Sequence, residues 1–509
     1  MDSLKQHALG ATLPVSPHAV ACSLPTVADV VGYEEKAPAV VAALRSGYPR
    51  FVRHAYLREL EALARKSEGW GAEDAVFLVL PETPLDALLP DAGDRANLTV
   101  FDYAPCCRIL RLPAGHRAAP TVGKRIQHIG CVLSSRAAEA LLVEAGLLPE
   151  PFAEERDPVA APSVCQSIAQ LLGSEVDATW LTNSGMGAFF SAFEAVRAVQ
   201  RPRGRGLWVQ LGWLYVDTGK ILQSFLSDDE RLVSLSAVDD LAALETLIQA
   251  NPNQLAGVVI ETPTNPLVQV ADLARLRTIV REAGGILIAD PSIASAFNVD
   301  VFPLADICVQ SLTKYTGWSG DIMMGVLALN PDAPDRAALH AHIAAGIVPP
   351  AALDLARMAW ALPQAAAKVA RMNANALRLA ELLQAHPAVG GLWWSGAPAS
   401  ADAYARIRRA PENNGAILTI SLKGQFKVFY DAIEAFNGPS FGAEFTIVCP
   451  YLYLAHYDLV STAEGRRALE AEGLDPYLVR ISVGCEPIER LLAVFEAALA
   501  AALGAGTPD

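Results

Sequence analysis

Between residues 160 and 335, short apolar strands alternate with helix-like segments, and this alternation restricts the possible folds more than any other feature of the chain. Strands that are apolar along nearly their whole length fit a mainly parallel sheet with helices on both faces. Ligands of such α/β sheets bind beyond the carboxyl ends of the strands. Helices are expected at 163–173, 188–199 and 273–284, and strands at 179–182, 207–212, 256–262, 285–290 and 306–311.

The chain has 509 residues, more than the ~250–300 residues that a single hydrophobic core usually reaches. We therefore expect an N-terminal segment at 1–130, a large α/β domain at 131–340 and a smaller C-terminal α/β domain at 341–509. A long helix at 353–386, interrupted by Pro363, is predicted to lead into the last of these. That domain should end with a strand at 478–484 and a closing helix. The N-terminal segment shows no recognisable sheet order.

The composition predicts a folded protein without polyanionic partners. The chain is 52% hydrophobic, and its formal net charge of −15 should repel nucleic acid and anionic membranes. No signal-peptide pattern opens the sequence and no apolar stretch is long enough to span a bilayer, so a cytoplasmic location is expected. The eight cysteines are scattered without metal-ligand spacing, which favours reduced thiols and no metal site.

Lys314 directly follows the apolar strand at 306–311 in the motif Ser311-Leu312-Thr313-Lys314. Burial disfavours the ammonium form of a lysine, and a neutral amine can attack an aldehyde to form a Schiff base. Ser311 and Thr313 lie two residues apart, so in an extended strand their hydroxyls would face the same side and could bind a phosphate. By itself the motif fits a lysine that reaches solvent about equally well.

Asp290 ends the strand at 285–290 and precedes Lys314 by 24 residues. A carboxylate at this position can pair with a protonated pyridine nitrogen, which keeps pyridoxal 5′-phosphate (PLP) an electron sink. A helix N-cap is the alternative, and for an isolated aspartate it is the more common one. The presence of both Asp290 and Lys314 favours the PLP interpretation.

At Thr182–Ala188 a strand passes into a helix through small residues, which include Ser184, Gly185 and Met186. A helix N-terminus with free N–H groups binds anions, so phosphate is a natural ligand there. An ordinary glycine turn explains the same residues about equally well.

Three further residues are candidates for this site. Tyr215, after the strand at 207–212, could lie flat on a pyridine ring, although a core tyrosine is an equal alternative. Asn265, in the turn after the strand at 256–262, could bond the ring hydroxyl oxygen. Arg480, in the strand at 478–484, needs an anionic partner, which is either a substrate carboxylate or an internal Asp or Glu.

Taken in order, SGM, Tyr215, ETPTNPL, the strand-end Asp290, SLTKY…GDIMMG and VRISVG resemble the Cys/Met-metabolism (trans-sulfuration) PLP enzymes over residues 160–500. The segments 18–26, 31–35 and 47–51 resemble the extended fungal-type cystathionine γ-synthases. The resemblance implies fold type I, with a mainly parallel seven-stranded sheet in the large domain and a smaller α+β C-terminal domain. It also implies a homodimer or homotetramer with amino-acid substrates.

The resemblance also implies a role for each candidate. Lys314 would hold PLP and move protons, and Tyr215 would stack on the ring, so both are assigned to catalysis. Arg480 and Ser482 would bind the substrate. The cofactor would be bound by Ser184, Gly185, Met186, Tyr215, Asn265, Asp290, Ser311, Thr313 and Lys314.

Two segments depart from the family pattern. The phosphate-binding YxRxGNPT segment, which the family contributes across a dimer, is absent, and Arg156 stands near its expected place without a tyrosine. The ESL segment near the substrate is replaced at 443–446, where Phe445 takes the place of a small hydroxyl residue. These departures concern the cross-subunit contact and the choice of substrate.

The resemblance implies γ-replacement on an O-activated L-homoserine by L-cysteine, which yields L-cystathionine, with Lys314 as base and acid in turn. A γ-lyase or an O-acylhomoserine sulfhydrylase would use the same residues. A non-catalytic binding or regulatory protein on this fold is the alternative from another class. A nucleotide-dependent α/β enzyme is less well supported, because neither GxGxxG nor GxxxxGK[ST] follows a strand.

Overall fold

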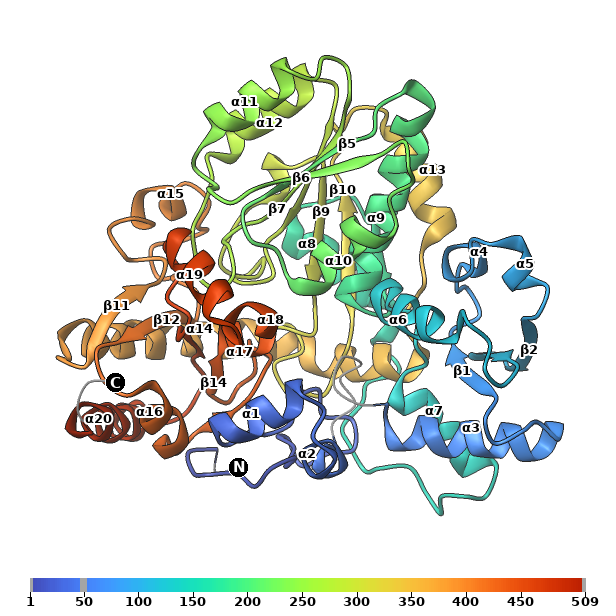
Figure 1. Ribbon diagram of the computed structural model, residues 1–509, viewed down its shortest axis with the longest axis horizontal. Helices are drawn as coiled ribbons and strands as arrows, with labels where there is room; N and C mark the ends of the chain where they lie inside the picture. Colours follow the sequence, from blue (N-terminus) through green and yellow to red (C-terminus); the bar gives the residue numbers. More distant parts are fainter. Residues whose placement is uncertain (1–2, 46–52, 506–509) are drawn as a thin grey trace.

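The computed structural model describes residues 3–45 and 53–505, and a seven-stranded sheet forms its centre (Figure 1). The strand order is β4-β10-β9-β8-β7-β5-β6, and β10 alone runs antiparallel to its neighbours. The expected mainly parallel sheet is therefore confirmed. The strands are β4 (Thr179–Thr182), β5 (Leu207–Leu211), β6 (Arg231–Leu235), β7 (Leu255–Glu261), β8 (Ile286–Asp290), β9 (Ile307–Ser311) and β10 (Gly325–Leu329).

Helices cover this sheet and connect its strands. β7 is buried at every residue and β8 at all but its last, which explains their almost continuous apolar sequences. β6 and β10 were not predicted from the sequence; β6 is only partly buried and carries two exposed polar side chains. The helices are α8 (Val164–Leu172), α9 (Gly185–Gln200), α10 (Val216–Ser224), α11 (Leu241–Gln249), α12 (Leu273–Glu282) and α13 (Arg336–Gly346).

The helix α14 (Ala352–Ala385) runs without a break through Pro363 into the C-terminal part, so the predicted interruption is wrong. Buried residues on both sides of the proline, from Met358 to Leu383, keep the helix packed along its length. The second sheet has the order β11-β12-β15-β14-β13. Its strands are β11 (Val389–Trp393), β12 (Ile417–Leu422), β13 (Phe436–Asn437), β14 (Ile447–Pro450) and β15 (Val479–Ser482).

Shorter helices and a long final helix complete this part. The final helix α20 packs on α14 and α16, and this agrees with the predicted closing helix. The helices are α15 (Ala401–Ala405), α16 (Phe426–Ala432), α17 (Tyr451–Ala455), α18 (Tyr457–Val460), α19 (Ala463–Ala471) and α20 (Ile488–Gly504).

The first 130 residues lie on two sides of the molecule (Figure 1). The helices α1 (Val27–Glu34) and α2 (Pro38–Ala43) lie beside the C-terminal part, where the Tyr430 hydroxyl donates a hydrogen bond to the Leu24 carbonyl. A three-stranded antiparallel sheet of order β1-β3-β2 lies on the other side. Its strands are β1 (Ala75–Val79), β2 (Thr99–Ala104) and β3 (Cys107–Leu112). The helices of this region are α3 (Ala55–Glu68), α4 (Leu85–Leu88), α5 (Ala92–Arg95) and α6 (Ala119–Ile129), and α7 (Ser135–Glu144) follows them in the chain.

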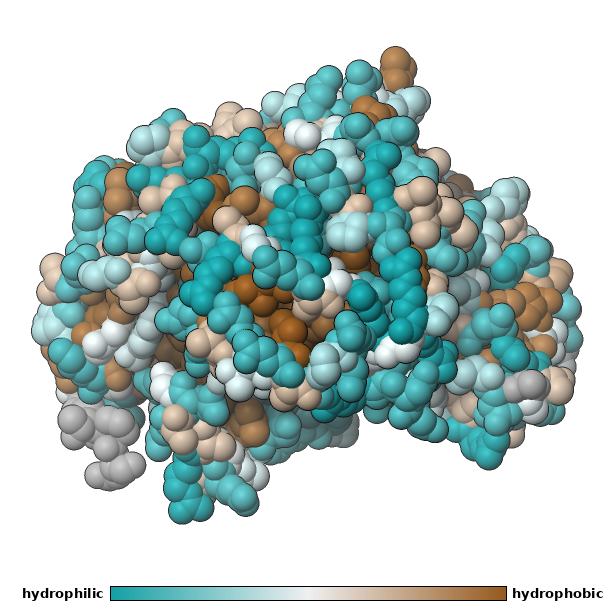
Figure 2. Space-filling view, turned by 90° about the horizontal axis from the view of Figure 1, so that it is seen from above, coloured by the Kyte–Doolittle hydropathy of each residue, from teal (hydrophilic) through white to brown (hydrophobic). Residues whose placement is uncertain are grey.

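On the face that Figure 2 shows, hydrophilic residues predominate and apolar residues gather in a few patches between them. Within the described residues, no helix has both the length and the apolar character needed to cross a membrane.

Candidate active site

The carboxyl ends of β7, β8 and β9 meet at one edge of the large sheet, where a cavity of about 140 Å³ opens toward the C-terminal part. This is the position where ligands of parallel α/β sheets bind. Predicted residues that lie far apart in the sequence line this one cavity. They are Ser184, Gly185, Met186, Tyr215, Asn265, Asp290, Ser311, Thr313, Lys314 and Arg480.

Lys314 is buried, with 5% of its surface exposed, so the alternative of a solvent-reaching lysine is wrong. Its Nζ donates a hydrogen bond to Ser440 Oγ at 2.7 Å and lies 5.0 Å from the centre of the Phe441 ring. The amine is thus held inside the cavity, where it can attack the aldehyde of a bound cofactor.

Asp290 lies at the end of β8, opposite Glu261 at the end of β7. Burial raises the pKa of Asp290 to about 6, although the Ser292 N–H donates a hydrogen bond to its carboxylate. No helix begins directly after Asp290, so it is not an N-cap. Burial and the nearby Asp290 charge raise the pKa of Glu261 well above its ordinary value. A cationic group is therefore the partner that would keep Asp290 ionised.

Glu261 also fixes Tyr215, because its carboxylate accepts a hydrogen bond from the Tyr215 backbone N–H. Tyr215 stands at the N-terminal end of α10 and lines the cavity. No role was predicted for Glu261 from the sequence, although its place at the end of an apolar strand was a usable signal.

The N-terminus of α9 lines the cavity with Ser184, Gly185 and Met186, and its free N–H groups are the predicted phosphate site. Ser184 caps this helix by accepting a hydrogen bond from the Gly187 N–H. A Cβ atom at Gly185 would lie 2.8 Å from Ser311 Cβ, so only glycine allows this close approach of α9 to β9. The backbone is therefore open to a phosphate group at this point.

Ser311 is the last residue of β9, and Thr313 lies in the turn beyond it, so they do not share one strand as predicted. The Thr313 hydroxyl accepts a hydrogen bond from the Met324 N–H and faces the Met324 carbonyl at 3.4 Å. Thr313 thus lines the cavity, but its hydroxyl also ties the Lys314 turn to the segment just before β10.

We expect the substitution Gly185→Ala to weaken PLP binding by about tenfold or more, a loss of ~1.4 kcal/mol or more. The added methyl would collide with Ser311 and separate the helix N-terminus from the phosphate site. Titration of the apo-protein with PLP, followed by absorbance, measures the affinity. Gly219→Ala is the matched control, because its Cβ would meet Gln210 at an ordinary 3.8 Å. Equal affinities of both variants would contradict this role of Gly185.

Arg480 lies in β15 and is 4% exposed. It donates hydrogen bonds to Asn265 Oδ1 at 3.1 Å and to the Ser440 carbonyl at 2.7 Å, and both partners are neutral. Within the described residues its Nε has no hydrogen-bond partner. These contacts do not support the alternative of an internal salt bridge, and they leave a buried guanidinium suited to a carboxylate.

Asn265 presents its amide oxygen to Arg480, so its NH₂ group is the part that remains for the predicted contact with a ring oxygen. Ser482 does not line the cavity: it is fully buried, and its hydroxyl accepts a hydrogen bond from the Gly442 N–H. The predicted contact of Ser482 with substrate is therefore replaced by support of the loop at 438–442.

This loop brings Ser440 and Phe441 into the cavity, and the sequence analysis missed both. Ser440 adopts a left-handed backbone with a φ of +88°, and a Cβ at Gly442 would lie 2.7 Å from the Tyr315 nitrogen. The glycines and the proline around Ser440 were the available signal of an unusual loop.

Neither Phe445 nor Arg156, the residues at the two departures from the family pattern, lines the cavity of this chain. Phe445 is buried in a cluster with Leu13 and Phe436, so its ring does not line the cavity. Arg156 Nε donates to Glu154, and this contact lies away from the cavity. The segment 47–51 falls outside the described residues, so its resemblance stays a prediction.

The residues present fit PLP: a buried lysine, a carboxylate for the pyridine nitrogen, a glycine-lined helix N-terminus for the phosphate and an aromatic residue beside them. Fold and site define a PLP-dependent enzyme of fold type I.

Comparison with known proteins identifies the family. Residues 160–500 match the family model described as Cys/Met metabolism PLP-dependent enzyme. The chain belongs to this family.

Two relatives and one solved structure show the range of similar proteins. The L-2-amino-4-chloropent-4-enoate dechlorinase/desaturase of Streptantibioticus cattleyicolor is 37% identical over 95% of this chain and 96% of its own length. Cystathionine gamma-synthase of Neurospora crassa is 34% identical over 63% of this chain and 51% of its own. A structure of cystathionine gamma synthase from Xanthomonas oryzae, in complex with aminoacrylate and cysteine, has a TM-score of 0.58 and 24% identity, and the match covers 68% of this chain and 87% of that one.

Proposed function

We propose that the protein eliminates an uncharged γ-substituent from an L-α-amino acid. The observation that carries this proposal is the distribution of charge in the cavity. Among the described residues that line it, Lys314 and Arg480 are the cationic ones. Lys314 is assigned to the cofactor, so Arg480 can pair with one carboxylate. A second carboxylate, from L-cysteine or from an O-succinyl group, would have no cationic partner among these residues.

The apolar side chains near Arg480 support the same conclusion. Phe441 and Tyr451 place their rings 5.0 and 5.3 Å from the Arg480 guanidinium, and Met323 and Leu454 also line the cavity. A side chain that carries a vinyl or halogen group would bury apolar surface here. The substrate named for the Streptantibioticus relative, an amino acid with chlorine on C4, has this character.

The chain's own residues can position and move the protons of such a reaction. When PLP is bound, it supplies the electron sink that acidifies the α- and β-hydrogens of an attached amino acid. Arg480 would hold the α-carboxylate, and Lys314 would accept and return protons. The Ser440 hydroxyl accepts from Lys314, and its carbonyl accepts from Arg480, so one residue joins the base to the carboxylate site. Glu261 keeps Tyr215 in place beside them.

For L-2-amino-4-chloropent-4-enoate the proposed elimination balances in atoms and electrons. The C4–Cl bond breaks, chloride and one proton leave, and the carbon chain gains one degree of unsaturation, without an oxidant.

γ-Replacement by L-cysteine, as in a cystathionine γ-synthase, is the second candidate, because the Neurospora relative bears that name. We also propose that the protein forms a homodimer or homotetramer and acts in the cytoplasm.

The test supplies the holoenzyme with L-2-amino-4-chloropent-4-enoate, O-acetyl-L-homoserine or O-succinyl-L-homoserine, each with and without L-cysteine. We expect release of chloride, or of 2-oxobutanoate from the acetyl ester, to be independent of cysteine. We also expect the succinyl ester to react at least ~10-fold more slowly than the acetyl ester, since one unpaired charge costs more than ~1.4 kcal/mol. Cystathionine formed in the presence of cysteine, with no chloride or 2-oxobutanoate released in its absence, would reject elimination and support replacement.

A further inference from the structure

A second cavity of about 140 Å³ adjoins the cofactor cavity and shares Gln127, Val132 and Met323 with it. Its other walls come from the N-terminal segment, α3, β1, α6 and the starts of α7 and α14. The chemistry proposed above does not use the charged residues that line it.

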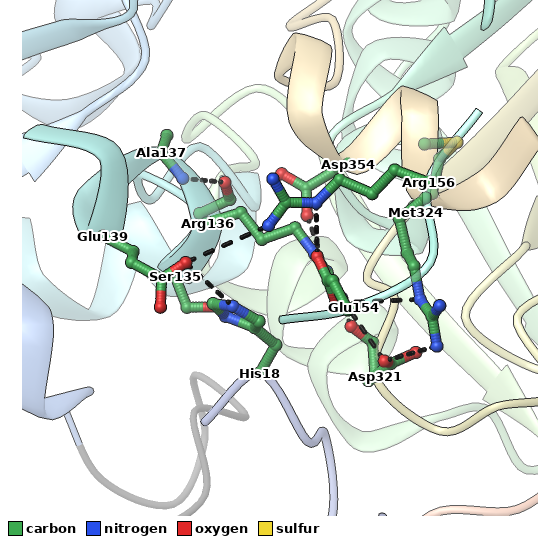
Figure 3. Close-up of polar contacts among 12 residues, drawn as sticks. His18, Ser135, Arg136, Ala137, Glu139, Glu154, Arg156, Asp321, Met324 and Asp354 are labelled. Carbon is green, nitrogen blue, oxygen red and sulfur yellow. Dashed lines mark hydrogen bonds and ion pairs between the residues drawn. The ribbon is translucent and has the colours of Figure 1, made fainter. Parts of the chain in front are cut away.

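A buried network of charged side chains lies along this cavity, and Figure 3 shows much of it. Arg136, which is 1% exposed, donates two hydrogen bonds to Glu154 at 2.7 and 2.8 Å and one to Asp354 at 3.0 Å. Three guanidinium groups face four carboxylates in this network. Its charged members are Arg136, Arg156, Arg357, Glu139, Glu154, Asp321 and Asp354.

His18 does not supply the missing positive charge. Burial, followed by the Arg136 charge, lowers its pKa to about 3, so the imidazole is neutral near pH 7. Its Nδ1 lies 3.0 Å from Ser135 Oγ, and its Nε2 lies 3.4 Å from Glu139. Arg53 and Glu61, which also line the cavity, pair with each other at 2.9 Å, and burial raises the pKa of Glu61 to about 7. Among the seven charged members of the network itself, carboxylates outnumber guanidinium groups by one.

Asp354 is the carboxylate that is left incompletely bonded. Its Oδ1 accepts from Arg136, whereas its Oδ2 has no hydrogen-bond partner among the described residues. Asp354 is 3% exposed and lines the cavity. A buried carboxylate oxygen without a donor is costly, so a cationic donor in the cavity would stabilise the protein.

The size and the remaining walls of the cavity point to an organic cation. A single water needs about 10–15 Å³ measured in this way, so a volume of about 140 Å³ exceeds the need of one water or one small inorganic ion. Apolar side chains, including Leu57, Phe77 and Ile126, form part of the wall. The side chain of Arg53 is 40% exposed and marks the side that reaches solvent.

We propose that this second cavity binds a small organic ammonium ion. The nitrogen donates a hydrogen bond to Asp354 Oδ2, and the apolar part packs against Leu57, Phe77 and Ile126. The site goes beyond the proposed reaction and does not depend on it. The segment 321–324 joins the two cavities, because Asp321 lines the second, Met323 lines both, and the Met324 backbone binds the Thr313 hydroxyl.

The test uses the holoenzyme and N,N-dimethylpropylammonium chloride, a tertiary ammonium that cannot form an imine with PLP. Calorimetric titration should give saturable binding, and sodium and potassium chloride at equal ionic strength should give none. Asp354→Asn keeps the side-chain shape and should weaken binding about tenfold or more, since a hydrogen bond to a charged group contributes ~1.5–3 kcal/mol. The exposed Asp332→Asn is the matched control and should bind like the unchanged protein.

Gly123→Leu provides a second test if Asp354→Asn does not fold. Gly123 lines the cavity, and a Cβ there would lie 3.4 Å from the Phe77 ring, so a leucine side chain would fill the space. This variant should fold and lose ammonium binding. The proposal is overturned if the unchanged protein shows no saturable binding, if potassium binds equally well, or if both cavity variants bind as the unchanged protein does.

Discussion

Replacement of Lys314 by alanine is expected to abolish covalent attachment of PLP and to lower turnover by at least ~10²- to 10⁴-fold, the usual contribution of a positioned proton-transfer group. The amine is buried just beyond the end of β9, beside Ser440, in the cavity that Asp290 also lines. Alanine removes both the attachment point and the base without adding volume. Borohydride reduction followed by peptide mass spectrometry should show the PLP mass on the Lys314 peptide of the unchanged protein and no label in the variant.

Lys427→Ala controls for the loss of a lysine, because Lys427 is exposed on α16 and away from the cavity. It should retain both the label and the activity. A PLP label on another lysine of the unchanged protein, or full turnover by Lys314→Ala, would contradict the assignment. The label is measured without substrate, so this result does not depend on which γ-substituent the enzyme removes.

Replacement of Arg480 by methionine is expected to lower kcat/KM by ~30- to ~5,000-fold, which corresponds to the about 2–5 kcal/mol lost when one partner of a buried, hydrogen-bonded charge pair is removed. Methionine keeps apolar contact with Phe441 and Tyr451 but removes the group with an unpartnered Nε. Steady-state kinetics with the best substrate of the elimination assay measure the loss.

Arg480→Lys should give an intermediate value, because it keeps the charge but loses the planar fork that binds a carboxylate in two places. PLP labelling of Lys314 should be unchanged in both variants, which separates substrate binding from damage to the cofactor site. Equal kcat/KM values for the unchanged protein and Arg480→Met would show that another group binds the carboxylate.

The cofactor site was predictable because its residues stand at strand ends and helix starts. Asp290 ends an apolar strand, Lys314 follows one, and Gly185 begins a helix, so local patterns locate them. Strand ends of a parallel sheet meet at one edge, and this brings residues 184, 290 and 314 together without knowledge of the connections. Ser440 and Glu261 were missed because their roles come from partners 126 and 46 residues away.

The predictions that failed did so for one reason: contacts between segments that are separate in the sequence outweighed the local pattern. Pro363 does not interrupt α14, because packing along the whole helix outweighs the loss of one backbone hydrogen bond. Phe445 packs in a core with Leu13, a contact that spans almost the entire chain. Thr313 bonds the Met324 backbone in a turn that the strand pattern does not reveal.

The amino-acid sequence alone determined the α/β class and pointed to the cofactor, and it predicted Lys314 and Asp290 as the residues that bind it, because these inferences depend on burial periodicity and on residue types at element ends. The tertiary structure decided which charges meet. It placed Glu261 beside Asp290, left Arg480 with neutral partners, and gathered Arg136 and Asp354 beside a second cavity. The strength of a charge interaction depends on the separation of the two groups and on their exposure to water, so only the packed chain determines which carboxylates are paired and which remain available for a ligand.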